Sequence, residues 1–123
     1  ALVIPAIGRG AAGLQLRQEA GRVAAVLREA RLKAVTQRRT ARVTLDPVRN
    51  TVAVTLGDPD RPVRELTIAP ELRVTVATGS ESLAFSSRGL TRDTRWVLEA
   101  RGGRQLAVAV DAVTGRVTVG PRS

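Results

Sequence analysis

The sequence predicts an α+β fold in which one long N-terminal helix is followed by about eight strands in antiparallel sheets. Three observations predict it: a helical apolar pattern that no proline interrupts, alternating apolar and polar residues in the rest of the chain, and turn-forming residues between the alternating runs. The chain has 123 residues, of which 43% are hydrophobic. This length is sufficient for one domain with a packed core and too short for a second.

The helical pattern runs from about Ala12 to Arg39. Apolar residues recur at alternating spacings of four and three, which predicts one buried face; they are Leu16, Ala20, Val23, Leu27, Ala30 and Ala34. At about 100° per residue, a group of arginines falls within an arc of about 100° beside that face; they are Arg17, Arg28, Arg31, Arg38 and Arg39. The helix is therefore expected to be amphipathic and strongly basic.

The rest of the chain alternates with the period of a strand. The first two expected strands contain Val43 with Leu45 and Val52 with Leu56, and the others are Val63–Ala69, Leu72–Thr78, Ser82–Ser86, Thr94–Ala100, Gln105–Asp111 and Arg116–Val119. Residues 57–62 are expected to form a loop outside the sheets, because two prolines flanked by aspartates fit neither a helix nor a strand ladder.

The composition argues against an enzyme. Histidine, cysteine and methionine are absent, which excludes disulfides, thiol catalysis, iron–sulfur clusters and histidine-based triads, and we expect neither a metal nor a cofactor. Lys+Arg is 20 and Asp+Glu is 11, a net charge of +9. Residues 1–42 hold nine basic and two acidic residues (+7), and residues 43–123 hold eleven and nine (+2), so most of the excess lies on or beside the helix.

Isolated motifs are better explained by structure than by catalysis. Residues 8–13 match the dinucleotide-binding pattern G-x-G-x-x-G, but Pro5 precedes it and no parallel strand follows, so we interpret it as a joint between two helical segments. Asp58 and Asp60 are expected in a surface turn, and Phe85 and Trp96 in the core. The basic helix face is either solvated or in contact with an acidic neighbour, lipid headgroups or nucleic-acid phosphate.

Four segments, taken in order, resemble a known family. They are the apolar run Ala-Leu-Val-Ile-Pro-Ala-Ile at residues 1–7, the helical motif of residues 27–35, a segment from Leu83 to Gly89 that contains Phe85, and the segment from Leu106 through Gly115 to Val117. The chain resembles the H-type minor pseudopilins of type II secretion, the GspH/FimT-like family of type IV pilin-like proteins. The family motif residues are Phe85, Gly89, Gly115 and Val117.

The resemblance implies a pilin-like fold in which the helix packs on two antiparallel sheets through the six-residue apolar face. Residues 1–10 are then the end of a hydrophobic N-terminal helix and residues 11–123 a single globular domain. It further implies a cleaved and methylated precursor, a single membrane pass in the bacterial inner membrane and a periplasmic domain. The implied partners are the other minor pseudopilins, the major pseudopilin and an exoprotein substrate.

Two functions follow from the resemblance. The first is that of a non-enzymatic subunit of the pseudopilus that drives protein export. The alternative is that of a type IV pilus minor pilin that binds DNA for natural transformation through basic residues. The residues expected to contact a partner or DNA are all arginines: Arg28, Arg31, Arg38, Arg101, Arg104, Arg116 and Arg122.

Overall fold

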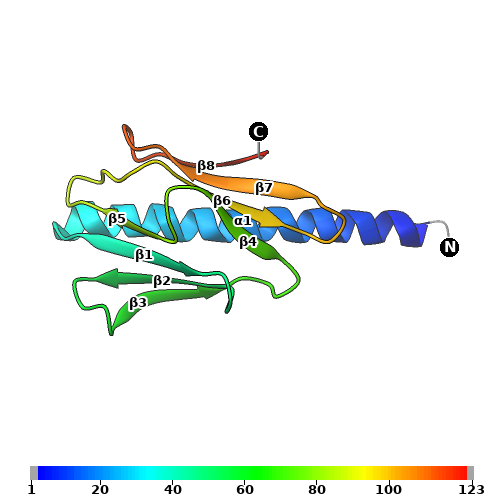
Figure 1. Cartoon of the computed structure of the whole chain (residues 1–123), viewed down its shortest axis with the longest axis horizontal. Helices are drawn as coiled ribbons and strands as arrows, with labels where there is room; N and C mark the ends of the chain where they lie inside the picture. The colour runs from blue at the N-terminus through cyan, green and yellow to red at the C-terminus, as the bar shows by residue number, and fades with distance from the viewer. Residues whose placement is uncertain (1–2, 122–123) are drawn as a thin grey trace.

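The computed structural model describes the backbone of residues 3–121 and the side chains of residues 13–121. One helix precedes eight strands (Figure 1). The elements are α1 (Val3–Gln37), β1 (Ala41–Asp46), β2 (Thr51–Leu56), β3 (Pro62–Thr67), β4 (Arg73–Thr78), β5 (Ser82–Phe85), β6 (Thr94–Glu99), β7 (Gln105–Val110) and β8 (Val117–Gly120). The predicted α+β architecture is confirmed.

Helix α1 differs from the predicted helix at both ends. It begins at Val3, so residues 8–13 lie within one continuous helix, and the interpretation of that segment as a joint between two helical segments is wrong. It ends at Gln37, because Arg38 adopts a left-handed backbone conformation with φ 53°. The amide of Arg39 then donates to the carbonyl of Ala34 at 3.1 Å, which closes the last turn.

The strands form two four-stranded antiparallel sheets, in the orders β3-β2-β1-β5 and β4-β6-β7-β8. Figure 1 shows strands β1 to β3 along one side of α1 and strands β7 and β8 along the other. The observed strand ends differ from the predicted ends by at most two residues, and several coincide with them. Pro62 was expected in a loop, but it is the first residue of β3 and pairs with Thr55. Because β3 is an edge strand, a proline without an N–H is tolerated there.

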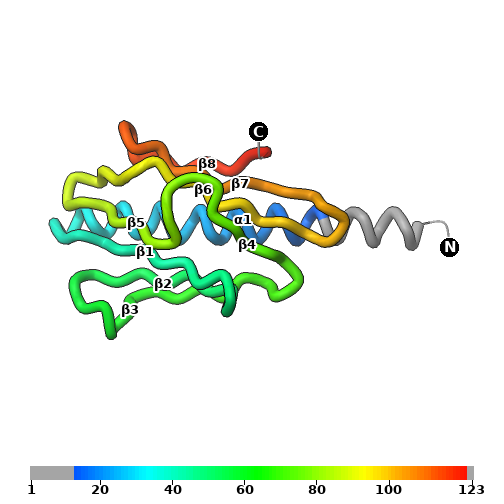
Figure 2. Tube along the Cα trace, in the orientation of Figure 1, coloured from blue at the N-terminus to red at the C-terminus, as the bar shows by residue number. Residues whose placement is uncertain are grey.

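The chain crosses between the sheets three times. After β3 it enters the second sheet as β4, returns to the first as β5, and then completes the second with β6 to β8 (Figure 2). Asn50 fastens the first crossing, since its side-chain amide donates to the carbonyls of Ala69 at 3.1 Å and Leu72 at 2.8 Å. Its φ of 53° is tolerated because asparagine adopts the left-handed conformation more readily than most residues.

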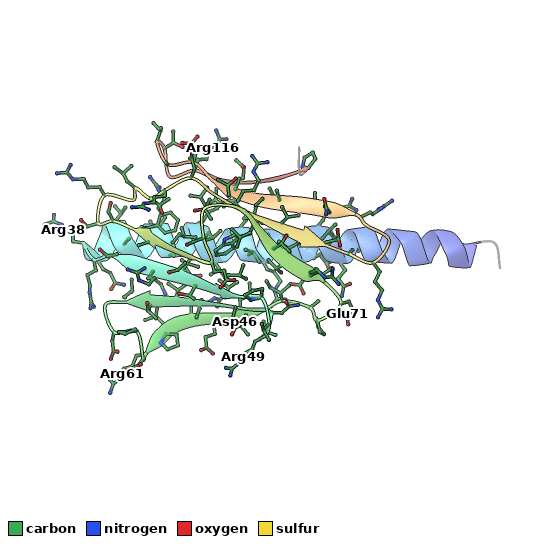
Figure 3. All side chains as sticks on the ribbon, in the orientation of Figure 1. Arg38, Asp46, Arg49, Arg61, Glu71 and Arg116 are labelled. Atoms are coloured by element: carbon green, nitrogen blue, oxygen red, sulfur yellow. The ribbon has the colours of Figure 1, made fainter. Side chains whose placement is uncertain are left out.

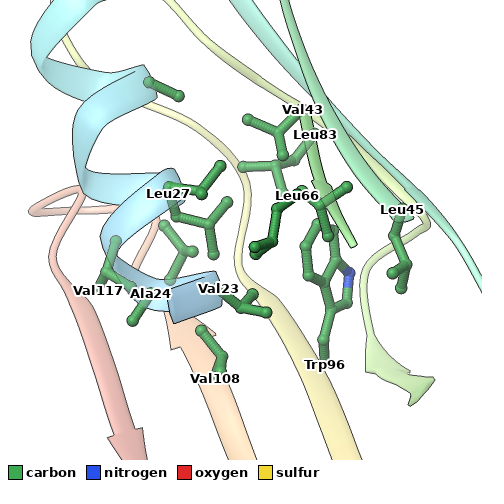
Figure 4. Packing of buried hydrophobic residues seen from close by; sticks show 14 of the residues in the cluster. Val23, Ala24, Leu27, Val43, Leu45, Leu66, Leu83, Trp96, Val108 and Val117 are labelled. Carbon is green, nitrogen blue, oxygen red and sulfur yellow. The ribbon is translucent and has the colours of Figure 1, made fainter. Parts of the chain in front are cut away.

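The core lies between α1 and the inner faces of both sheets and is mainly aliphatic. Leu27 of α1 lies between Val117 of the second sheet on one side and Val43 and Leu83 of the first on the other (Figure 4). The two aromatic side chains, of Phe85 and Trp96, are both buried, as expected. The indole nitrogen of Trp96 donates to the carbonyl of Ser80 at 3.0 Å, so its burial leaves no unpaired donor.

Candidate functional site

The predicted packing face of α1 is buried along its whole length. Each of its six residues is at most 3% exposed: Leu16, Ala20, Val23, Leu27, Ala30 and Ala34. Three of the six are alanines, whose small side chain lets a sheet approach the helix axis closely. This face holds α1 against both sheets and fixes which helix residues point toward the turns and strand edges around it.

Arg31 connects α1 to two turns that are distant in the sequence. Its Nε donates to the carbonyl of Gly89, in the β5–β6 connection, at 3.1 Å. Its Nη2 donates to the carbonyl of Thr114, in the β7–β8 turn, at 3.4 Å. Arg31 was predicted to contact a partner or DNA, but the structure assigns these two guanidinium donors to contacts within the chain.

Each of the two turns contacts Arg31 through a glycine, Gly89 or Gly115, at a position that a residue with a side chain would occupy only with strain. Gly89 has φ +81° and Gly115 has φ +71°, conformations that cost other residues about 1 kcal/mol or more. A Cβ on Gly115 would lie 2.5 Å from both the Gly89 carbonyl oxygen and the Nε of Arg31. We call this cluster of Arg31, Gly89, Thr114 and Gly115 the Arg31 clasp.

The Arg31 clasp brings together residues from three of the four segments that carried the family resemblance. Arg31 belongs to the helical motif of residues 27–35, Gly89 to the segment that begins at Leu83, and Gly115 to the segment that begins at Leu106. The other two motif residues are core residues, since Phe85 is 0% exposed and Val117 is 4% exposed. The motif residues of the two later segments therefore lie in the core or in the Arg31 clasp.

Arg28 lies one helical turn before Arg31 and contacts the neighbouring edge strand. Its Nη2 donates to the carbonyl of Val117 in β8 at 2.9 Å. Between the helix and this strand lies a groove of about 530 Å³, lined by Arg28, Arg31, Arg116 and β8, with no acidic residue among the lining residues that the structure describes. We call it the α1–β8 groove.

Of the other predicted arginines, Arg116 also lines the groove, whereas Arg38, Arg101 and Arg104 do not. Arg38 lies at the C-terminal end of α1 and Arg116 near the β7–β8 turn (Figure 3). Arg101 and Arg104 occupy the β6–β7 turn, at the opposite end of β7 from Arg116, and the guanidinium of Arg104 lies against Gly13 of α1. Arg122 lies outside the described residues. The predicted arginines therefore divide between separate ends of the domain.

Sequence reasoning missed Glu19, which is 7% exposed. Its Oε1 accepts a hydrogen bond from the amide of Ala69 at 3.2 Å, and its Oε2 accepts one from Arg22 at 2.8 Å. Glu19 thereby attaches α1 to the segment that crosses between the sheets. The signal was available, because Glu19 follows Leu16 by three positions and precedes Val23 by four, the spacing of the buried face.

The chemistry of these groups is that of binding. Within residues 13–121, no group of three or more potential metal ligands is close enough to hold an ion. No helix in the described part of the chain has the length and hydrophobicity that a membrane crossing requires. What the surface offers is guanidinium groups beside an exposed strand edge, which suits anionic or strand-forming partners.

Comparison with known proteins agrees with this description. The family model described as type II transport protein GspH matches residues 19–115. The fold is similar to that of the type IV minor pilin FimU of Pseudomonas aeruginosa, at 21% identity over 86% of this chain and 88% of that one, with a TM-score of 0.74. It is also similar to the minor pseudopilin EpsH from the type 2 secretion system of Vibrio cholerae, at 13% identity over 87% and 97%, with a TM-score of 0.73.

No curated protein sequence matches the chain. The two solved structures establish the pilin-like fold, and the family model covers most of the chain, including both glycines of the Arg31 clasp and the packing face of α1 except Leu16. Members of this family are structural pseudopilins and not enzymes. The chain belongs to the GspH family of type II transport proteins.

Proposed function

We propose that this protein is a minor pseudopilin that assembles with the major pseudopilin and the other minor pseudopilins into the pseudopilus of a type II secretion system. Residues 11–123 form its periplasmic globular domain, and residues 1–10 end a hydrophobic N-terminal helix that is held in the inner membrane before assembly. The precursor is cleaved and methylated, and the assembled filament drives an exoprotein substrate outward. The protein contributes a packing surface and no catalysis.

The observation that carries this proposal is the family match across residues 19–115, which includes residues 19–37 of α1 and the turns that the Arg31 clasp joins to it. The outer side of α1 adds support. Leu14 is 49% exposed and Leu32 is 62% exposed, although both lie on the helix whose other face is fully buried. Exposed leucines on a rigid helix offer apolar surface to neighbouring subunits.

Genetic complementation tests the proposal. A strain that lacks this protein is expected to lose secretion through its type II system and to regain it with the full-length wild-type gene. Leu32→Glu should restore secretion poorly, whereas Val48→Glu, a matched change at a 92% exposed residue in the β1–β2 turn, should restore it fully. Normal secretion in the deletion strain, with loss of type IV pili instead, would overturn the proposal.

The alternative function, DNA capture by a type IV pilus, is favoured by one observation, the net charge of +9. Fluorescence anisotropy with a short duplex at about 50 mM and about 200 mM salt tests it, because phosphate contacts weaken steeply with salt. The DNA alternative predicts tight binding at low salt that is lost in the double variant Arg101→Ala, Arg104→Ala or in Arg116→Ala. The absence of binding at low salt would reject it.

A further inference from the structure

We propose that the α1–β8 groove is a docking site for an extended, acidic segment of a neighbouring protein subunit. The segment adds as a strand to the free edge of β8 and places its carboxylates against the arginines of the groove. The proposal rests on the proposed function only for the identity of the partner, another subunit of the same filament. The site itself follows from charge, strand register and the volume of the groove.

The charged side chains that line the groove are all positive. Arg28, Arg31 and Arg116 line it, and none of the described lining residues is acidic. Arg28 and Arg31 donate to backbone carbonyls, which occupies some of their N–H groups but neutralises none of their charge. None of the three forms an ion pair within residues 13–121. Carboxylates of a partner would meet fixed guanidinium groups, which bind them through charge-assisted hydrogen bonds.

The backbone of β8 is open on the side of the groove. The carbonyl of Arg116 accepts a hydrogen bond from the amide of Asp111 at 3.0 Å, so the backbone groups of Arg116 point toward the β7 side of the sheet. Because backbone groups alternate along a strand, Val117 and Val119 point their N–H and C=O groups away from β7. The carbonyl of Val117 is taken by Arg28. Val119, which is 39% exposed, keeps both groups available to an added strand.

These two features together favour a peptide over nucleic acid. A free strand edge recognises another polypeptide backbone, because main-chain hydrogen bonds supply the affinity and side chains the selectivity. Nucleic acid would use the arginines and leave the edge unpaired. Single-stranded nucleic acid also binds through exposed aromatic rings, and both aromatic residues of this chain are buried. A groove of about 530 Å³ suits a short extended segment.

The test measures binding of a fluorescein-labelled peptide of about eight residues that alternates glutamate and valine, with the 123-residue chain as titrant. Arg116→Glu reverses one charge in the groove, and Arg101→Glu makes the same change at the distant β6–β7 turn. Val119→Pro removes the outward N–H and no bond to β7, since that N–H points away from the sheet. Thermal unfolding of each variant checks that it is folded.

We expect Arg116→Glu and Val119→Pro each to weaken binding by about tenfold or more, and Arg101→Glu to weaken it by less than about threefold. Equal losses for the two charge reversals would overturn the proposal, since binding would then follow net charge alone. Should Val119→Pro unfold, the wild-type amide of Val119 decides by NMR: slower hydrogen exchange with peptide supports an added strand, and unchanged exchange rejects it.

Two further results separate this inference from the proposed function. A duplex that displaces the peptide and binds more tightly would assign the groove to nucleic acid and overturn the inference. Failure of the peptide to bind, with secretion still dependent on the protein, would reject the groove as a docking site and leave the pseudopilus function standing. If the peptide binds the protein but the deletion strain secretes normally, the proposed function is rejected and the docking site stands.

Discussion

Replacing Gly115 with alanine is expected to destabilise the domain far more than the same replacement at Gly103. Both glycines have positive φ, +71° and +87°, so an alanine is strained at either position. They differ in their surroundings. A Cβ at Gly103 would meet nothing within 4 Å, whereas one at Gly115 would lie 2.5 Å from the Gly89 carbonyl oxygen and from the Nε of Arg31. The comparison isolates the close approach from the backbone strain.

The magnitudes follow from these geometries. The left-handed conformation costs alanine about 1 kcal/mol, which is the whole expected effect at Gly103. At Gly115 the two turns and Arg31 must also separate. The 3.1 Å bond from Arg31 to Gly89 is then lost, and a hydrogen bond from a charged donor contributes about 2 kcal/mol. Gly115→Ala should therefore lower the free energy of unfolding by about 3 kcal/mol.

Thermal and urea unfolding followed by circular dichroism measures both variants. For a domain of this size, about 1 kcal/mol corresponds to about 4 °C in melting temperature, so the expected losses are about 4 °C for Gly103→Ala and about 12 °C for Gly115→Ala. Changes in the unfolded chain cancel in the comparison, because both are glycine-to-alanine substitutions. Equal losses would refute the reasoning, since the Arg31 clasp would then not depend on the missing Cβ.

Substitutions at Leu27, Glu19 and Asn50 test other contacts by the same unfolding measurements. Leu27→Asp should unfold the domain because it buries an unpaired charge. Leu32→Asp, at a residue that is 62% exposed on the same helix, should melt near the wild-type temperature. A cooperative melt of Leu27→Asp near the wild-type temperature would contradict the assignment of Leu27 to the core. Glu19→Ala should cost about 1–3 kcal/mol by leaving the Ala69 amide unpaired, and Glu19→Gln should cost less. Asn50→Gly should lower the free energy of unfolding by about 2 kcal/mol because two hydrogen bonds are lost, although glycine adopts the left-handed backbone conformation readily. Stability equal to wild type would show that those bonds contribute nothing.

The sequence predicts the elements of this fold well because each has its own periodicity. The helix face from Leu16 to Ala34 repeats every three or four residues, and the strands alternate, so burial followed directly. The ends of α1 were less predictable. A glycine destabilises a helix by only about 1 kcal/mol relative to alanine, so the glycines of residues 8–13 do not by themselves end the helix. Arg38 ends the helix in a conformation that arginine rarely adopts.

The pairing of strands and the Arg31 clasp could not be predicted from local patterns. Alternation in β4 and β5 shows that they are strands but not which sheet each joins, because that choice depends on distant partners. Arg31 was expected beside the apolar face of the helix, but no local pattern indicates which backbone groups it contacts within the chain. Its contacts lie 58 and 83 positions away, in two turns whose positions only the complete fold determines.

The crossing of the chain between the sheets has a consequence for the order in which the domain can fold. The first sheet is completed only when β5 pairs with β1, where Ala41 lies opposite Phe85. Because β4 precedes β5 in the chain, a strand of the second sheet is synthesised before the first sheet can be completed. Neither sheet is therefore a contiguous segment that could fold by itself. Such long-range pairing slows folding and favours one cooperative transition. A newly synthesised chain would thus stay open to proteases until almost its whole length is available.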